Sequence, residues 1–193
     1  MKRICVFCGA NSGKKPEYKS AAIHLADELV SRNIEIVYGG GSIGLMGVLA
    51  ERAMELGGKV TGVIPEALAL KEVAHDTISE LIVVGSMHER KAKMAELSDG
   101  FISLPGGIGT IEETFEMLTW SQLGFHNKPC GIINVLGFYD KLIEFLNHTS
   151  EEKFFMDIYR RMLIVETDPS ALLERFEQYN SPQVKHWIAE DET

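Results

Sequence analysis

The feature that most constrains the fold is an alternation of short apolar runs with longer helical patterns. Several runs are almost continuously apolar, which is typical of parallel strands covered on both faces. The runs lie at 3–8, 34–38, 59–64, 80–84, 100–104, 130–135 and 162–165. Helical patterns lie near 17–32, 44–57, 87–97, 110–123, 138–148 and 169–179. This repetition predicts an α/β fold with one doubly wound parallel sheet of about seven strands flanked by helices.

Length and charge narrow the class of protein further. The 193 residues predict a single domain over 1–180, followed by an acidic tail at 181–193. The net charge of −9 argues against nucleic acid and anionic membranes as partners. More than half of that charge lies from Glu166 onward, so a small anion such as a phosphate remains compatible with the body of the chain.

The three cysteines favour a reducing, cytoplasmic location. Cys5 and Cys8 form a C-x-x-C inside an apolar run, where residues three apart point to opposite faces of a strand. We therefore expect core cysteines, the alternative being a redox or metal pair. The histidines show no metal spacing, and we predict no metal and no cofactor.

Two glycine-rich loops follow predicted strands. The first, Gly39–Gly47, satisfies G-x-G-x-x-G, and Glu66 further on suits a dinucleotide fold. Its Gly40 and Gly41 are candidate phosphate-binding residues, because glycine lets the backbone approach a ligand and a helix N-terminus attracts anions. The alternative is a tight turn that needs glycine only for packing.

The second loop, Pro105–Thr110, is more specific. It runs from a strand into a helix, and its Gly106, Gly107 and Gly109 could cradle a phosphate. It lacks the Gly-Lys-Ser/Thr ending of a P-loop. The helix that follows opens with Glu112 and Glu113. An ordinary strand-to-helix turn is the alternative.

A helical wheel of the helix at 110–123 predicts two unlike faces. Ile108, Ile111, Phe115 and Leu118 share a stripe that we expect to face the core. Glu113, Glu116, Met117 and Trp120 fall roughly opposite. A face that combines acids with Trp and Met predicts a ligand or a second subunit over it, and hence a homodimer. The alternative is a solvated charged face.

Arg90 occupies an apolar-face position in the first turn of the helix at 87–97. An arginine there needs an anionic partner. That partner is either an anionic ligand or a structural salt bridge, for example to Glu113. Lys91 and Lys93 beside it add positive charge or are simply solvated.

The chain resembles the LONELY GUY family of cytokinin riboside 5′-monophosphate phosphoribohydrolases. The resemblance covers residues 1–180 and rests on GGGSIGLMG at 39–47, MHERKAKM at 87–94, PGGIGTIEE at 105–113 and WSQLG at 120–124. It implies a homodimeric Rossmann-type hydrolase. Such enzymes cleave the N-glycosidic bond of N6-modified AMP, and bacterial relatives often cleave AMP, giving free base and ribose 5-phosphate. Many relatives were labelled lysine decarboxylases by sequence transfer.

The resemblance also implies roles for individual residues. The catalytic pair falls on Arg90 and Glu113, and further substrate contacts fall on Lys91, Glu72 and Thr119. The phosphate-binding loop and its neighbours fall on Gly106, Gly107, Ile108, Gly109, Thr110 and Glu112. Ile108 and Asn127 stand where many members have an aromatic and a basic residue, which bears on substrate preference.

The residues agree with that chemistry. N-glycoside cleavage passes through a ribosyl cation, which a carboxylate such as Glu113 can stabilise or supply with activated water. Arg90 would bind the phosphate or orient Glu113, and its charge would favour an ionised Glu113. A non-catalytic nucleotide or cofactor carrier on the same fold is the alternative, followed by an NAD(P) oxidoreductase.

Overall fold

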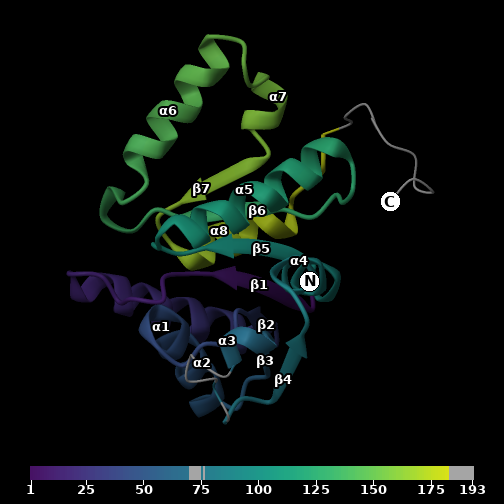
Figure 1. Ribbon diagram of the computed structural model, residues 1–193. Coiled ribbons are helices and arrows are strands. Elements are labelled where there is room, and N and C mark those ends of the chain that lie inside the picture. The colour runs from purple at the N-terminus through teal and green to yellow at the C-terminus, as the bar shows by residue number, and fades with distance from the viewer. Residues whose placement is uncertain (70–74, 76, 183–193) are drawn as a thin grey trace.

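This computed structural model describes residues 1–69, 75 and 77–182, and strands and helices alternate along them (Figure 1). The strands are β1 (Arg3–Phe7), β2 (Glu35–Tyr38), β3 (Val60–Pro65), β4 (Glu80–Val84), β5 (Gly100–Ser103), β6 (Cys130–Ile133) and β7 (Leu163–Glu166). The helices are α1 (Pro16–Ser31), α2 (Gly44–Glu55), α3 (Glu66–Ala69), α4 (Met87–Leu97), α5 (Ile108–Leu123), α6 (Asp140–Glu151), α7 (Asp157–Arg160) and α8 (Pro169–Glu177), with a 3-10 turn η1 (Val135–Gly137). Every predicted strand and helix is present, and α3 and α7 are additional short helices. The predicted α/β class is confirmed.

All seven strands form one parallel sheet in the order β4-β3-β2-β1-β5-β6-β7. The central strand is β1, whose Ile4 lies opposite Ile36 of β2 on one side and Gly100 of β5 on the other. The chain winds outward from β1 through β4 and then crosses to the other side of β1 to start β5. The strand order therefore reverses between β1 and β5. Ligands of open α/β sheets bind at such a switch point, outside the carboxyl ends of the strands.

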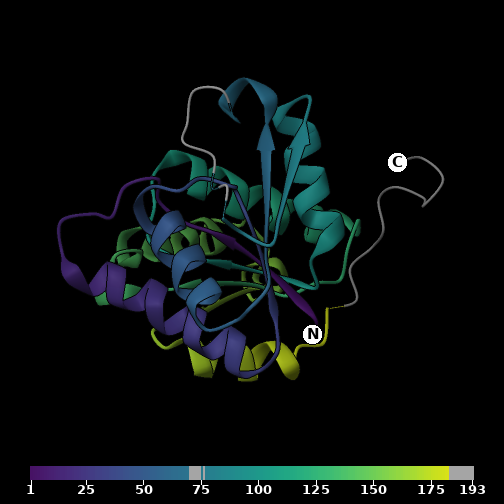
Figure 2. The same cartoon turned by 90° about the horizontal axis from the view of Figure 1, so that it is seen from below.

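Helices cover both faces of the sheet and create two apolar cores. Helices α1, α2 and α8 pack on one face, and α4 and α5 pack on the other (Figure 2). Side chains of β1 alternate between these cores, so Cys5 belongs to one and Cys8 to the other. The prediction of diverging core cysteines is confirmed, since all three cysteines are buried and free.

The predicted core face of α5 is wrong in part. Ile108 is 82% exposed, whereas Glu113 is 9% and Met117 1% exposed. The buried face consists of Thr110, Glu113, Thr114, Met117, Leu118 and Ser121. Its first turns face polar groups at the end of β5, where the hydroxyls of Ser103 and Thr114 lie 2.6 Å apart. The wheel failed because it assumed that apolar residues face inward along the whole helix.

The described residues contain neither a membrane-spanning helix nor a metal-binding cluster of side chains. No helix in them is both long and apolar enough to cross a membrane. Nor do three or more His, Cys, Asp or Glu side chains gather there in an arrangement that could hold a metal ion.

Candidate active site

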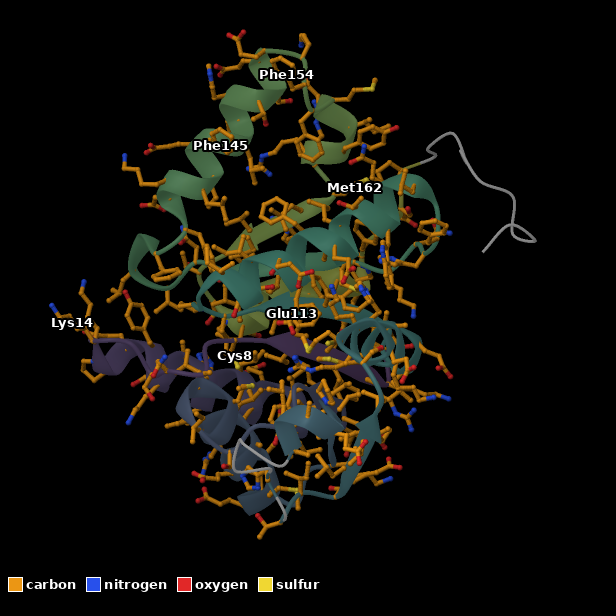
Figure 3. The ribbon with its side chains drawn as sticks, viewed as in Figure 1. Cys8, Lys14, Glu113, Phe145, Phe154 and Met162 are labelled. Carbon is orange, nitrogen blue, oxygen red and sulfur yellow. The ribbon has the colours of Figure 1, made fainter. Side chains whose placement is uncertain are left out.

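A cavity of about 470 Å³ opens at the carboxyl ends of β1 and β5, at the switch point of the sheet. Its walls come from the segment after β1, the start of α2, and the loop between β5 and α5. Arg90 of α4 and Glu113 of α5 both line it. In Figure 3, Glu113 lies beside the ribbon of α5, with Cys8, another lining residue, at the end of β1 below it.

The segment Gly9–Gly13 forms one wall of the cavity, although no motif in the sequence marked it as part of a site. The backbone N–H of Gly9 donates to the carbonyl of Pro105 at 3.1 Å, and the carbonyl of Gly9 accepts from the N–H of Leu45 at 3.0 Å. One glycine thus ties together the ends of β1, β5 and the start of α2. A run of small residues directly after the central strand was the available signal.

The second glycine loop meets the cavity through its backbone. A Cβ on Gly106 would overlap the hydroxyl of Thr110, so this glycine is required by packing. By contrast, a Cβ on Gly107 or Gly109 would have no atom within 4 Å. Packing against this chain therefore does not require glycine at these two positions. The backbone there is open to whatever occupies the cavity.

Three helices, α1, α2 and α5, begin at the cavity. Their N-cap residues, Lys15, Ile43 and Gly107, form no side-chain hydrogen bond with the first turn. In α4 and α8, the side chains of Ser86 and Asp168 provide such a cap. Free N–H groups and the positive end of the helix dipole favour an anion, so the uncapped start of α5 suits a phosphate.

The guanidinium of Arg90 is held from three directions. Its Nε donates to the carbonyl of Val63 in β3 at 3.0 Å, and its Nη2 donates to the carbonyl of Gly39 at 3.2 Å. Its Nη1 lies 3.5 Å from Oε1 of Glu113. Both side chains are nearly buried, at 11% and 12% exposed. Of the two kinds of partner considered for Arg90, the salt bridge to Glu113 is therefore present, and both of its members also line the cavity.

The carboxyl of Glu113 is not held in its ionised form as strongly as the sequence suggested. Burial raises the pKa of Glu113 to about 7, although the nearby positive charge of Arg90 lowers it. Desolvation outweighs the ion pair because the carboxyl has lost most of its water. A carboxyl with a pKa near 7 can exchange a proton at physiological pH, as a general base or acid does.

Two glycines of the first loop leave room for neighbouring parts of the protein at the site. A Cβ on Gly39 would lie 2.1 Å from Nη2 of Arg90, so the guanidinium occupies the space that a side chain would take. A Cβ on Gly44, whose φ is +64°, would lie 2.3 Å from the backbone of Ala10. The described cavity lining includes Leu45 and Met46 but neither Gly40 nor Gly41, and the phosphate contacts predicted for these two glycines remain predictions.

Other predicted contacts lie away from the cavity or beyond the described ranges. Lys91 pairs with Glu112 and Glu116 on α5, outside the lining. The hydroxyl of Thr119, on the exposed side of α5, donates to the carbonyl of Phe115. Glu72 lies outside the residues that the structure describes. Their roles remain predictions.

Two aromatic rings complete the wall of the cavity. Tyr18 and Phe138 meet edge to face with their ring centres 5.8 Å apart, and both line the cavity. Phe138 follows a 3-10 turn in which Leu136 has a φ of +51°. Such a left-handed aliphatic residue is uncommon and holds the turn that presents the ring. Nothing in the sequence pattern connected these two rings.

Comparison with solved structures gives the fold class of the chain. The doubly wound sheet is shared with the molybdenum cofactor carrier protein of Chlamydomonas reinhardtii, at a TM-score of 0.69 and 20% identity over 92% of this chain and 96% of that one. The molybdenum cofactor binding protein of Rippkaea orientalis matches at a TM-score of 0.70 and 19% identity, over 92% and 97%. The fold and the switch-point cavity define a Rossmann-like α/β protein.

Sequence relatives define the family. Residues 46–176 match the family model described as "possible lysine decarboxylase". The cytokinin riboside 5′-monophosphate phosphoribohydrolase LOG2 of Arabidopsis thaliana is 48% identical over 92% of this chain and 84% of its own length. The probable phosphoribohydrolase LOGL6 of rice is 48% identical over 93% and 72%. The chain belongs to the LONELY GUY family of cytokinin riboside 5′-monophosphate phosphoribohydrolases.

Proposed function

We propose that the chain hydrolyses the N-glycosidic bond of a nucleoside 5′-monophosphate, either AMP or an N6-modified AMP, to free base and ribose 5-phosphate. The observation that carries this proposal is the Arg90–Glu113 pair, which faces a cavity beside the uncapped N-terminus of α5. The names of the relatives, which describe this reaction, support it.

Each part of the cavity has a task in that reaction. The open backbone at Gly107 and Gly109 and the start of α5 take the 5′-phosphate. Glu113 lies one helical turn beyond Thr110, where its ionised carboxylate stabilises the cationic ribosyl group as the bond to the base breaks. It also accepts a proton from the attacking water, whose hydroxyl bonds to the anomeric carbon. The departing base takes up one proton from solvent, and Glu113 then releases the proton of the water to solvent, so that the reaction consumes one water and no net proton.

Arg90 keeps the carboxyl of Glu113 in place and lowers its pKa against the effect of burial. Since two carbonyls hold the guanidinium, this geometry exists before substrate arrives. Catalytic groups that are fixed in advance need no reorganisation during the reaction.

Product analysis tests the proposal directly. The purified chain is incubated with AMP and with isopentenyladenosine monophosphate, and free base and ribose 5-phosphate are quantified. We expect Glu113→Gln to lower kcat by at least about 100-fold. The matched control is Glu144→Gln, an exposed acid on α6 whose ion pair is with Lys141, and it should retain activity. Tight nucleotide binding without any product would instead favour the carrier alternative.

We also propose that the chain forms a homodimer. The sequence argument for it relied on Met117, which is now placed in the core, and on Trp120, which is half-buried against the same core. On α5, Ile108 is an exposed apolar side chain, whereas Ile111 and Phe115 are half-buried against that core, as Trp120 is. Light scattering at micromolar concentration should give twice the chain mass, and a monomer mass would contradict the proposal.

A further inference from the structure

Lys91 is a buried cation next to the active site that does not reach the cavity. Its side chain is 8% exposed, and its Nζ forms ion pairs with Glu112 and with Glu116, the latter at 2.9 Å. These two acids lie one turn apart on α5, so the ammonium sits between them. The described cavity lining contains neither Lys91 nor the two acids.

The result is two adjacent ion-pair links between the same two helices. Arg90 and Lys91 are consecutive on α4, and Glu112 and Glu113 are consecutive on α5. Arg90 pairs with Glu113 on the cavity side, while Lys91 pairs with Glu112 and Glu116 behind it. Movement of α5 along α4 would have to break both links. The Lys91 link is thus placed to set the position of the Glu113 carboxyl relative to the Arg90 guanidinium.

The same link balances the charge around Glu113. From α5, Glu112 and Glu116 raise the pKa of Glu113, and from α4, Arg90 and Lys91 lower it, while burial has the largest effect and raises it. The neighbouring groups Cys5, on β1, and Cys8, directly after it, are buried thiols whose own pKa is raised by burial, and so they are uncharged. Removing the charge of Lys91 would leave two unbalanced carboxylates beside Glu113.

We propose that Lys91 is a positioning residue, which ties Glu112 and Glu116 to α4, fixes the Arg90–Glu113 pair and does not touch the nucleotide. This inference rests on the proposed function for the role of Glu113, and it replaces the substrate contact that the family resemblance implied for Lys91. Its distinguishing consequence is that Lys91 controls the reacting carboxyl without contributing to binding of the phosphate.

Kinetics of Lys91→Met and Lys91→Arg separate these two roles. Methionine keeps an unbranched side chain as far as the ε carbon and removes the charged ammonium. We expect Lys91→Met to lower kcat by about tenfold or more, while KM for AMP and the dissociation constant of ribose 5-phosphate change less than about twofold. Lys91→Arg should restore most of kcat, because it retains the charge. A tenfold weaker binding of ribose 5-phosphate with kcat preserved would overturn the proposal.

Titration of Glu113 provides a readout that needs no turnover. The side-chain carboxyl is followed by carbon-13 NMR, with Glu113→Gln assigning the signal. We expect Lys91→Met to raise the pKa of Glu113 by about one pH unit and Glu116→Gln, which keeps Lys91, to lower it. If neither variant moves the titration, or both move it in the same direction, the proposal is wrong. Absence of hydrolysis by the wild-type chain would overturn the proposed function while leaving this titration decisive for Lys91.

Discussion

The two glycine loops look alike in sequence and differ in what their glycines do. In the first loop, a Cβ on Gly39 would collide with Arg90, and a Cβ on Gly44 would collide with the backbone of Ala10. In the second loop, a Cβ on Gly107 or Gly109 would meet open space. The first loop therefore uses glycine to pack the protein against itself, and the second uses it to leave backbone accessible. A glycine motif alone does not separate these two uses.

Gly44→Ala should have the largest effect, and it should act on stability. The new methyl would need a left-handed backbone and would overlap the backbone of Ala10 at 2.3 Å, which a side-chain movement cannot relieve. We expect a loss of at least about 3 kcal/mol of unfolding free energy. Urea unfolding followed by circular dichroism measures this. An unchanged midpoint would show that the first loop is not a packing device.

Glu113→Gln should change stability in a pH-dependent way. Glu113 belongs to the helix that follows the second loop, and it pairs with Arg90, which packs against Gly39 of the first loop. Its folded pKa of about 7 exceeds the ordinary value of 4.5 for a glutamate, so the folded state binds the proton more tightly than the unfolded state. The ionised carboxyl therefore destabilises the fold progressively as pH rises from about 4.5 to 7. Gln resembles the protonated carboxyl and avoids that cost, which is about 3 kcal/mol above pH 7.

The measurement compares unfolding of wild type and Glu113→Gln at pH 4 and pH 8. The variant should be more stable at pH 8 and nearly equal to wild type at pH 4, despite its loss of activity. A variant that is equally stabilised at both pH values would contradict the ionisation argument, since Gln would then act through packing alone.

Gly39→Ala should lower activity with a smaller cost in stability. Gly39 is not in the left-handed region, so alanine fits its backbone, but the methyl would take the place of Nη2 of Arg90. The guanidinium is at the flexible end of its side chain and would move away from Glu113. We expect kcat/KM to fall by about 100-fold. In an Arg90→Ala background the same change should have no further effect, and additive losses would show that Gly39 acts by another route.

The sequence predicted the fold well because the signal is periodic and local. Each apolar run became a strand, and the C-x-x-C was correctly divided between two cores. The site was predicted only where a motif marked it, at Arg90, Glu113 and the loop before α5. The sequence did not mark Gly9–Gly13, Tyr18 or Phe138. These residues line the cavity because of the order of the strands in the sheet, which no local sequence pattern encodes.

The buried face of α5 was also predicted wrongly because a local pattern does not show what a helix packs against. A helical wheel sorts residues by polarity, and it placed Glu113 outside because charged residues are seldom buried. The inner face of α5 begins at a cavity, so polar residues there are buried without being in the apolar core. Contacts between α4 and α5, including those of Lys91, also depend on the sheet that carries both helices.

Gly109→Ala should have the smallest effect, and its two parts should have opposite signs. Alanine is the better helix former, so the start of α5 should gain about 0.5 kcal/mol. The methyl would point into space that is empty of protein and, in our proposal, occupied by the phosphate, so the dissociation constant of ribose 5-phosphate should rise about tenfold.

Gly57 is the matched control: a Cβ there also meets open space, but φ is +75° and the residue does not line this cavity. Gly57→Ala should therefore lower stability by about 1 kcal/mol and leave binding unchanged. Calorimetry and thermal unfolding measure both quantities, and normal binding by Gly109→Ala would mean that the open backbone of the second loop does not hold the phosphate.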